Sequence, residues 1–128
     1  MAVDMQMPIL VVDDYKCMVR TIQNLLKQLG FSNLADATSG EQALEKLRAA
    51  EFGLVISDWR MEPGDGLELL QTMRADESLR ETPFIMVTAE RGGDRVLAAK
   101  QAGVDNYIVK PFTAATLKRR LAAVVGEF

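Results

Sequence analysis

The chain has 128 residues, of which 48% are hydrophobic and 26% are charged, and its net charge is −3. This length and composition predict one globular domain over residues 1–128 and exclude a largely disordered chain. The acidic balance argues against nucleic acid as a partner. No segment approaches the ~20 apolar residues of a membrane helix or resembles a signal peptide, so we expect no membrane association and a cytoplasmic location.

The absence of one residue type and the scarcity of another restrict the reactions that the protein can catalyse. The chain has no histidine, which excludes a Ser-His-Asp or Cys-His mechanism and any imidazole metal ligand. Its single cysteine, Cys17, excludes an intramolecular disulfide and a thiolate zinc cluster. Carboxylates, hydroxyls and lysines are left to carry whatever chemistry the protein has.

Five short apolar segments predict buried strands. In chain order they cover residues 8–12, 31–37, 54–58, 83–88 and 106–109, the second being the weakest pattern. Polar residues stand at the ends of four of them: Asp13 and Asp14, Asp58, Thr88 and Lys110.

A helical pattern of apolar residues follows each predicted strand. Gly30 closes the first helix, Ser39 and Gln42 form a capping box for the second, and Thr113 caps the last. The pair Gly92-Gly93 predicts a mobile start for the fourth helix. The fourth helix is predicted to run through Val96, Leu97 and Ala99 to Ala102. The residues expected on the inward faces of the other four helices are Met18, Ile22, Leu25, Leu26 and Leu29; Ala43, Leu44, Leu47 and Ala50; Leu67, Leu70 and Met73; and Leu117, Leu121, Val124 and Val125.

Five strand–helix units of this size predict an α/β fold, a parallel sheet with helices on both faces. In such a sheet every strand ends at the same edge, where the ligand crevice lies. We therefore expect Asp13, Asp14, Asp58, Thr88 and Lys110 to converge there.

Three carboxylates in one crevice repel one another, each close pair by about 4 kcal/mol at an effective dielectric near 20. Mg²⁺ offsets such a charge, since it prefers oxygen ligands from one or two carboxylates, water and phosphate. With Lys110 as a second cation and Thr88 as a hydroxyl donor, the set predicts a phosphoryl-binding site in which Asp58 is the nucleophile.

Each of these residues taken alone also has a purely structural interpretation. The pair Asp13-Asp14 is compatible with a helix cap, Lys110 with a solvated surface residue, and Thr88 with an ordinary strand end. Asp65 fits a loop residue or the cap of the third helix, and Trp59 and Tyr107 are expected as packing residues. The joint placement of the polar residues favours the functional interpretation.

With these residues in place, the sequence resembles the receiver domain of two-component response regulators, and within that family the single-domain chemotaxis regulators of the CheY type. The resemblance runs from about Ile9 to Val125. Its motifs are VVDD, NLLKQLGF, VISDW, DGLELL, MVTAE and YIVKPFTAATL, which carry an acidic pair, an aspartate, a threonine and Lys-Pro in the family's order.

The resemblance implies a flavodoxin-like, CheY-like doubly wound sheet of five strands in the order 2-1-3-4-5. It implies that Asp58 takes a phosphoryl group from a phosphohistidine on a sensor histidine kinase. Mg²⁺ is then bound by Asp14, Asp58 and the backbone carbonyl of Arg60, with Asp13 acting through water. The phosphoryl oxygens are held by Thr88, Lys110 and the amide of Ala89, and the Lys110-Pro111 peptide is cis.

Activation, by the same resemblance, is a population shift in which Thr88 moves toward the phosphate and Tyr107 turns inward. The surface around the fourth helix, the fifth strand and the fifth helix changes and binds an output protein, by resemblance a component of the flagellar motor switch. The protein is expected to act as a monomeric phosphoprotein in this phosphorelay and not as an enzyme.

Three features depart from the family pattern. The loop after Asp58 contains Glu62-Pro63-Gly64, where the family usually places proline directly after methionine. Arg60 stands where a smaller polar residue is common, beside the route of attacking water, so the lifetime of the acyl phosphate is left open. Gly92-Gly93 lies at the start of the presumed output surface.

Three other functions remain open. The receiver could serve as a phosphate sink or in signalling unrelated to motility. Lys118, Arg119 and Arg120, with Arg91 and Arg95 nearby, could bind an anionic second messenger such as a cyclic dinucleotide, although a solvated helix face explains them equally. An aspartate-nucleophile phosphatase is disfavoured, because such enzymes need an acid two positions after the nucleophile, and Arg60 stands there.

Overall fold

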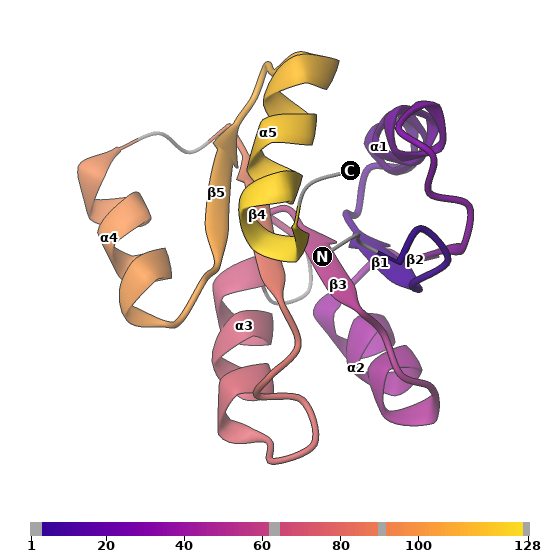
Figure 1. Ribbon diagram of the computed structural model, residues 1–128. Coiled ribbons are helices and arrows are strands. Elements are labelled where there is room, and N and C mark those ends of the chain that lie inside the picture. Colours follow the sequence, from indigo (N-terminus) through magenta and orange to yellow (C-terminus); the bar gives the residue numbers. More distant parts are fainter. Residues whose placement is uncertain (1–3, 62–64, 90–91, 127–128) are drawn as a thin grey trace.

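The computed structural model describes residues 4–61, 65–89 and 92–126. Its five strands form one parallel sheet in the order β2-β1-β3-β4-β5, as predicted (Figure 1). The elements in chain order are β1 (Ile9–Val12), α1 (Lys16–Gln28), β2 (Leu34–Ala37), α2 (Gly40–Ala49), β3 (Leu54–Ser57), α3 (Gly66–Ala75), β4 (Phe84–Thr88), α4 (Gly93–Gln101), β5 (Asn106–Val109) and α5 (Ala114–Val125).

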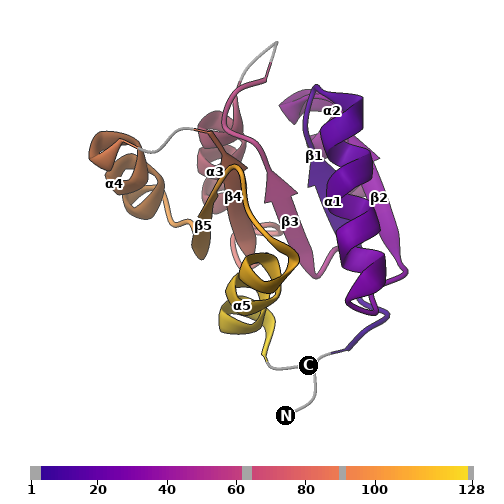
Figure 2. The same ribbon diagram turned by 90° about the horizontal axis from the view of Figure 1, so that it is seen from above.

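The sheet is buried on both faces because successive side chains of each strand alternate between two cores. Ile9 and Val11 belong to the core under α1 and α5, whereas Leu10 and Val12 belong to the core under α2, α3 and α4. Figure 2 shows α3 and α5 on opposite sides of the sheet. The continuous apolar runs of the sequence follow from this double burial.

The helices begin and end at the capping residues that the sequence predicts. Gly30 has φ of 108° and closes α1, where the amides of Gly30 and Phe31 donate to the carbonyls of Lys27 and Leu26. The hydroxyl of Ser39 accepts from the amide of Gln42 at 3.1 Å. Asp65 caps α3 and Thr113 caps α5. Each of these predicted boundaries is confirmed.

Two local predictions were wrong. The second strand begins at Leu34 and not at residue 31, because the amide of Phe31 is bound to the end of α1. Ala50 does not face inward, since α2 ends at Ala49 and Ala50 is extended and exposed.

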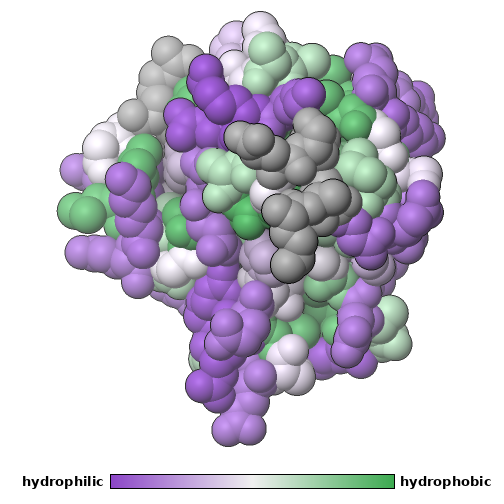
Figure 3. Space-filling view, viewed as in Figure 1, coloured by the Kyte–Doolittle hydropathy of each residue, from purple (hydrophilic) through white to green (hydrophobic). Residues whose placement is uncertain are grey.

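The side of the molecule that carries α4 shows hydrophobic residues at the surface, at the left of Figure 3. Ala99 is the one fully buried residue of α4, all nine residues of which are described.

None of the helices in the described part of the chain has the length and hydropathy of a membrane span.

Candidate functional site

Strand register places the predicted residues at one edge of the sheet. Val12 of β1 pairs with Ser57 of β3, so the residues that follow them, Asp13 and Asp58, leave the sheet side by side. At β4 and β5, the amide of Lys110 donates to the carbonyl of Thr88 at 2.8 Å. The parallel topology thus gathers residues that are far apart in the sequence.

Lys110 joins the two carboxylates. Its ammonium nitrogen lies 3.1 Å from an oxygen of Asp58 and 3.4 Å from an oxygen of Asp13. The three side chains are 17%, 13% and 2% exposed, respectively, so little water screens them. One cation therefore offsets the repulsion between two acids that the register brings together.

Asp13 is the more deeply buried acid. Burial raises the pKa of its carboxyl above the ordinary value, and the charge of Asp58 adds to the rise. The amide of Tyr15, which donates to Asp13 at 3.0 Å, and the ammonium of Lys110 oppose this rise without cancelling it. Desolvation of the Asp13 carboxylate thus costs free energy, and its partners only partly offset that cost.

Both carboxylate oxygens of Asp58 are oriented by partners, and its backbone is fixed. Its Oδ1 accepts the amide hydrogen of Trp59 at 2.6 Å, and its Oδ2 contacts Lys110. Its carbonyl accepts from the hydroxyl of Ser57, and the amide of Gly66 donates to the neighbouring Trp59 carbonyl at 2.7 Å. An oriented carboxylate on a fixed backbone suits a nucleophile.

A pocket of about 680 Å³ opens over these side chains. Asp14 and Arg60, both exposed, also line it, so the structure brings four of the predicted strand-end residues together with Arg60. The remaining lining residues are Tyr15, Trp59, Met61, Asp65 and Arg95.

Thr88 and Ala89 are placed differently from the four strand-end residues that share this pocket. Thr88 is 1% exposed and is not among the residues that line the pocket. Ala89 lines an apolar groove on the other side of Lys110, together with Pro111, Phe112 and residues of α1. The Lys110-Pro111 peptide between the two hollows is cis, as the resemblance implies.

The acidic side chains of the pocket are of the type that binds a hard cation. Asp13, Asp14 and Asp58 offer only oxygen atoms, which Mg²⁺ prefers. Among residues 4–61, 65–89 and 92–126, however, no three acidic or cysteine side chains already form a metal-binding group. Instead, Lys110 holds two of the acids, and the predicted loop departure at Glu62-Pro63-Gly64 lies outside the described residues.

Aromatic residues form the wall beside Asp58. Trp59 and Tyr107 are 3% and 9% exposed, which confirms them as packing residues, and their rings meet edge to face with centroids 6.4 Å apart. The guanidinium of Arg95 lies over the Trp59 ring, 5.3 Å from its centroid. Sequence patterns did not reveal this contact, because it depends on where α4 lies relative to the residue that follows Asp58.

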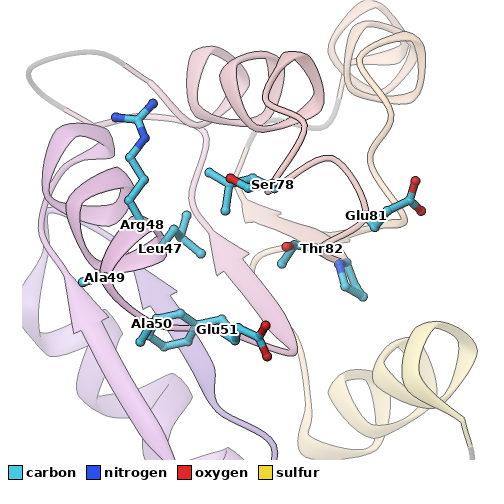
Figure 4. Close-up of a pocket in the computed structure, with 11 residues that line it drawn as sticks. Leu47, Arg48, Ala49, Ala50, Glu51, Ser78, Glu81 and Thr82 are labelled. Carbon is cyan, nitrogen blue, oxygen red and sulfur yellow. The ribbon is translucent and has the colours of Figure 1, made fainter.

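A second hollow, of about 550 Å³, lies at the opposite edge of the sheet (Figure 4). Its walls come from the turns that precede β3 and β4, including Phe52, Thr82 and Pro83. Asp58 follows the carboxyl end of β3, so this hollow has no part in the acidic site.

Comparison with known proteins agrees with this geometry. Residues 9–122 match the family model described as the response regulator receiver domain, and the chain belongs to this family. It is a receiver of the CheY type. The chain is 49% identical over 115 residues to the chemotaxis protein CheY-3 of Vibrio cholerae, covering 90% of this chain and 88% of the relative. It is 47% identical over 118 residues to the chemotaxis protein CheY of Pseudomonas aeruginosa, covering 92% and 95%.

Solved structures show the same fold. CheY4 of Vibrio cholerae superposes with a TM-score of 0.83 at 29% identity and covers 91% of this chain and 96% of that one. The receiver domain of the sensor histidine kinase PA1611 of Pseudomonas aeruginosa, described with a magnesium ion in its active-site cleft, gives 0.84 at 31% identity over 95% and 99%. The predicted strand order and family are confirmed, and they are consistent with two-component signalling and chemotaxis.

Proposed function

We propose that this receiver domain is phosphorylated on Asp58 by a sensor histidine kinase and signals by phosphorylation-controlled protein binding. The observation that carries the proposal is the position of Lys110, whose ammonium contacts both Asp58 and Asp13 at the mouth of an open acidic pocket. A fixed lysine beside a partly exposed aspartate supplies the charge that a transferring phosphoryl group needs.

The reaction is a transfer from nitrogen to oxygen. An oxygen of Asp58 attacks the phosphorus of a phosphohistidine, the new P–O bond forms, and the P–N bond breaks with its electron pair left on the imidazole nitrogen. Lys110 stays beside the acceptor and stabilises the developing charge on the phosphoryl oxygens. Later, water attacks the phosphorus, the P–O bond to Asp58 breaks, and inorganic phosphate leaves with the carboxylate restored.

Mg²⁺ is the expected cofactor. Asp14, Asp58 and the carbonyl of Arg60 would hold it, with Asp13 acting through water, and it would neutralise charge between the acceptor and the phosphoryl group. Lys110 would then share Asp13 and Asp58 with the cation. Thr88, Lys110 and the Ala89 amide are proposed to receive the phosphoryl oxygens.

The proposed output is a change of binding surface. Thr88 and Tyr107 are the switch residues, and Tyr107 is already buried against Trp59 in this structure. A flagellar motor switch component is the favoured partner, because the relatives are chemotaxis proteins. A phosphate sink or non-motility receiver is the alternative, and the decay rate of the phosphorylated form would separate it from a signal carrier.

The decisive experiment treats the protein with acetyl phosphate and Mg²⁺ and follows intact mass and Trp59 fluorescence. We expect one phosphoryl adduct that requires Mg²⁺ and is absent from Asp58→Asn. The matched control is Asp65→Asn, which alters a carboxylate of the same pocket that caps α3, and which should still accept the phosphoryl group. An adduct that persists in Asp58→Asn would overturn the proposal.

The messenger-binding alternative is tested separately. Arg120 donates to the side chain of Asn106 at 3.2 Å, and Arg95 lies over Trp59 at the acidic pocket instead of joining the basic residues of α5. Titration of the unphosphorylated protein with a cyclic dinucleotide would support this alternative if binding survives Asp58→Asn and is lost in Lys118→Gln.

A further inference from the structure

Arg95 is the cation that links α4 to the wall of the acidic pocket. Its guanidinium lies 5.3 Å from the centre of the Trp59 ring, and the Trp59 amide donates to Asp58 at 2.6 Å. Arg95 also lines the same pocket as Asp58 and Lys110. A single residue on α4 is thus connected to the proposed phosphoacceptor through one residue, Trp59, by its ring on one side and its backbone amide on the other.

The start of α4 is exposed from Gly92 to Arg95. A Cβ added to Gly92 or Gly93 would meet nothing within 4 Å, which leaves open space around both residues. Of the described residues of α4, Ala99 alone is fully buried, and it lies about one turn after Arg95. The amides of Arg95 and Val96 donate to the carbonyl of Gly92, so the position of Arg95 and the order of this turn are coupled.

The charge of the pocket favours movement of the guanidinium toward a phosphoryl group. The lining residues include the four acids Asp13, Asp14, Asp58 and Asp65, against the three cations Arg60, Arg95 and Lys110. A phosphoryl group on Asp58 replaces one carboxylate charge with nearly two. Lys110 already contacts two acids, whereas the face of Trp59 keeps Arg95 oriented at the pocket wall.

We infer that Arg95 is a second phosphoryl-binding residue, which uses the Trp59 ring as a platform and ties the first turn of α4 to the phosphorylated site. The inference rests on the proposed phosphorylation of Asp58. An arginine suits this role better than a lysine, because its planar fork binds two phosphoryl oxygens at once and stacks on an aromatic face. Arg95 would be a positioning contact for α4 and not a group that takes part in bond cleavage.

A purely structural role for Arg95 makes a different prediction. If the guanidinium serves only to cover Trp59, its loss would change the unphosphorylated and phosphorylated proteins equally. If it binds the phosphoryl group, its loss would act on the phosphorylated form alone. The test therefore compares the two forms of each variant.

The experiment uses Arg95→Gln, Arg95→Lys and the control Lys100→Gln, an exposed cation in the last turn of the same helix that is absent from the pocket lining. Each protein is treated with acetyl phosphate and Mg²⁺. Intact mass gives the rate and donor dependence of adduct formation, and hydrogen exchange reports the amides of Arg95 and Val96. Exchange is measured with and without the phosphodonor.

We expect the wild type and Lys100→Gln to form the adduct and to slow exchange at the first turn of α4 about three- to tenfold, as a partly solvated charged contact allows. Arg95→Gln should form the adduct at a donor concentration raised about three- to tenfold, with no slowing of exchange. Arg95→Lys should restore part of the wild-type dependence on donor concentration but little of the slowing of exchange.

The outcomes separate this inference from the proposed function. Absence of an adduct in the wild type would overturn the proposed function, and this inference with it. An adduct in Arg95→Gln with unchanged donor dependence and the same slowing of exchange would overturn the inference alone. Equal changes in exchange before and after phosphorylation would assign Arg95 the structural role.

Discussion

At the scale of single residues, Asp13 shows the cost of assembling an acidic site. Its carboxyl is buried and its pKa is raised, chiefly by that burial. A raised pKa means that the charged form is less favourable in the folded protein than in the unfolded chain. Asp13 therefore destabilises the fold at neutral pH, and this penalty disappears as the pH falls through the raised pKa toward the unfolded value.

Asp13→Asn is therefore expected to raise the free energy of unfolding by about 1 kcal/mol at neutral pH, since it removes a buried charge and leaves Lys110 paired with Asp58. The gain should shrink toward acid pH. Denaturant unfolding at several pH values measures this gain.

Asp76→Asn is the control with the opposite expected sign. Hydrogen bonds from Ser78 lower the pKa of Asp76, so this variant should be less stable than the wild type at neutral pH. This loss of stability should also shrink toward acid pH.

Gly66 is required by a close backbone approach. A Cβ at this position would lie 2.1 Å from the carbonyl oxygen of Asp58, so Gly66→Ala must displace the backbone of the proposed phosphoacceptor. We expect a loss of about 2 kcal/mol or more in the free energy of unfolding and slower phosphorylation. Gly40 is the matched control, because it also begins a helix and its Cβ would lie 3.8 Å from the nearest atom, in Leu69. Equal stability of the two alanine variants would contradict the argument.

At the scale of elements, the sequence predicted the type and order of the strands and helices well. It predicted their exact ends less well. Apolar runs and caps such as Ser39, Asp65 and Thr113 act within a few residues, so they are visible in the sequence. Ala50 was misplaced because its burial depends on where α2 stops against the sheet. The convergence of Asp13, Asp58 and Lys110 was predictable because parallel topology alone dictates it.

Arg74 illustrates what sequence patterns could not reveal. From the last turn of α3 its guanidinium donates to the carbonyls of Gly103, Arg80 and Thr82 and pairs with Asp105 at 3.0 Å. Asp105 in turn accepts from the amide of Phe84 at the start of β4. One side chain thus fastens two turns to the sheet, and its partners lie up to 31 positions away.

Arg74→Ala is expected to lower the free energy of unfolding by about 2–3 kcal/mol, because it leaves several backbone carbonyls and Asp105 without their charged donor. Arg80→Ala is the matched control. Arg80 pairs with Glu77 at 3.6 Å, and both side chains are largely exposed, so its loss should cost at most about 0.5 kcal/mol. Chemical denaturation of both variants makes the measurement, and comparable losses would show that the network around Arg74 adds little.

At the scale of the whole molecule, the site couples cation binding to global stability. The fold brings acids together at the carboxyl edge of the sheet, and Lys110 offsets only part of their charge. A cation that binds the folded protein and not the unfolded chain stabilises the fold by RT ln(1 + [Mg²⁺]/Kd), or ~1.4 kcal/mol at ten times Kd. Binding of Mg²⁺ to these acids should thus stabilise the folded protein.

We therefore expect Mg²⁺ at millimolar concentration to raise the melting temperature in thermal denaturation, at ionic strength held constant with KCl. Asp14→Asn should lose most of this shift while folding normally, because Asp14 is exposed and lines the pocket. Asp36→Asn is the matched control, since Asp36 is an exposed acid of the edge strand β2 and does not line the pocket, and it should keep the shift. A melting temperature unchanged by Mg²⁺, or a shift equal in all three proteins, would contradict a magnesium site at Asp13, Asp14 and Asp58.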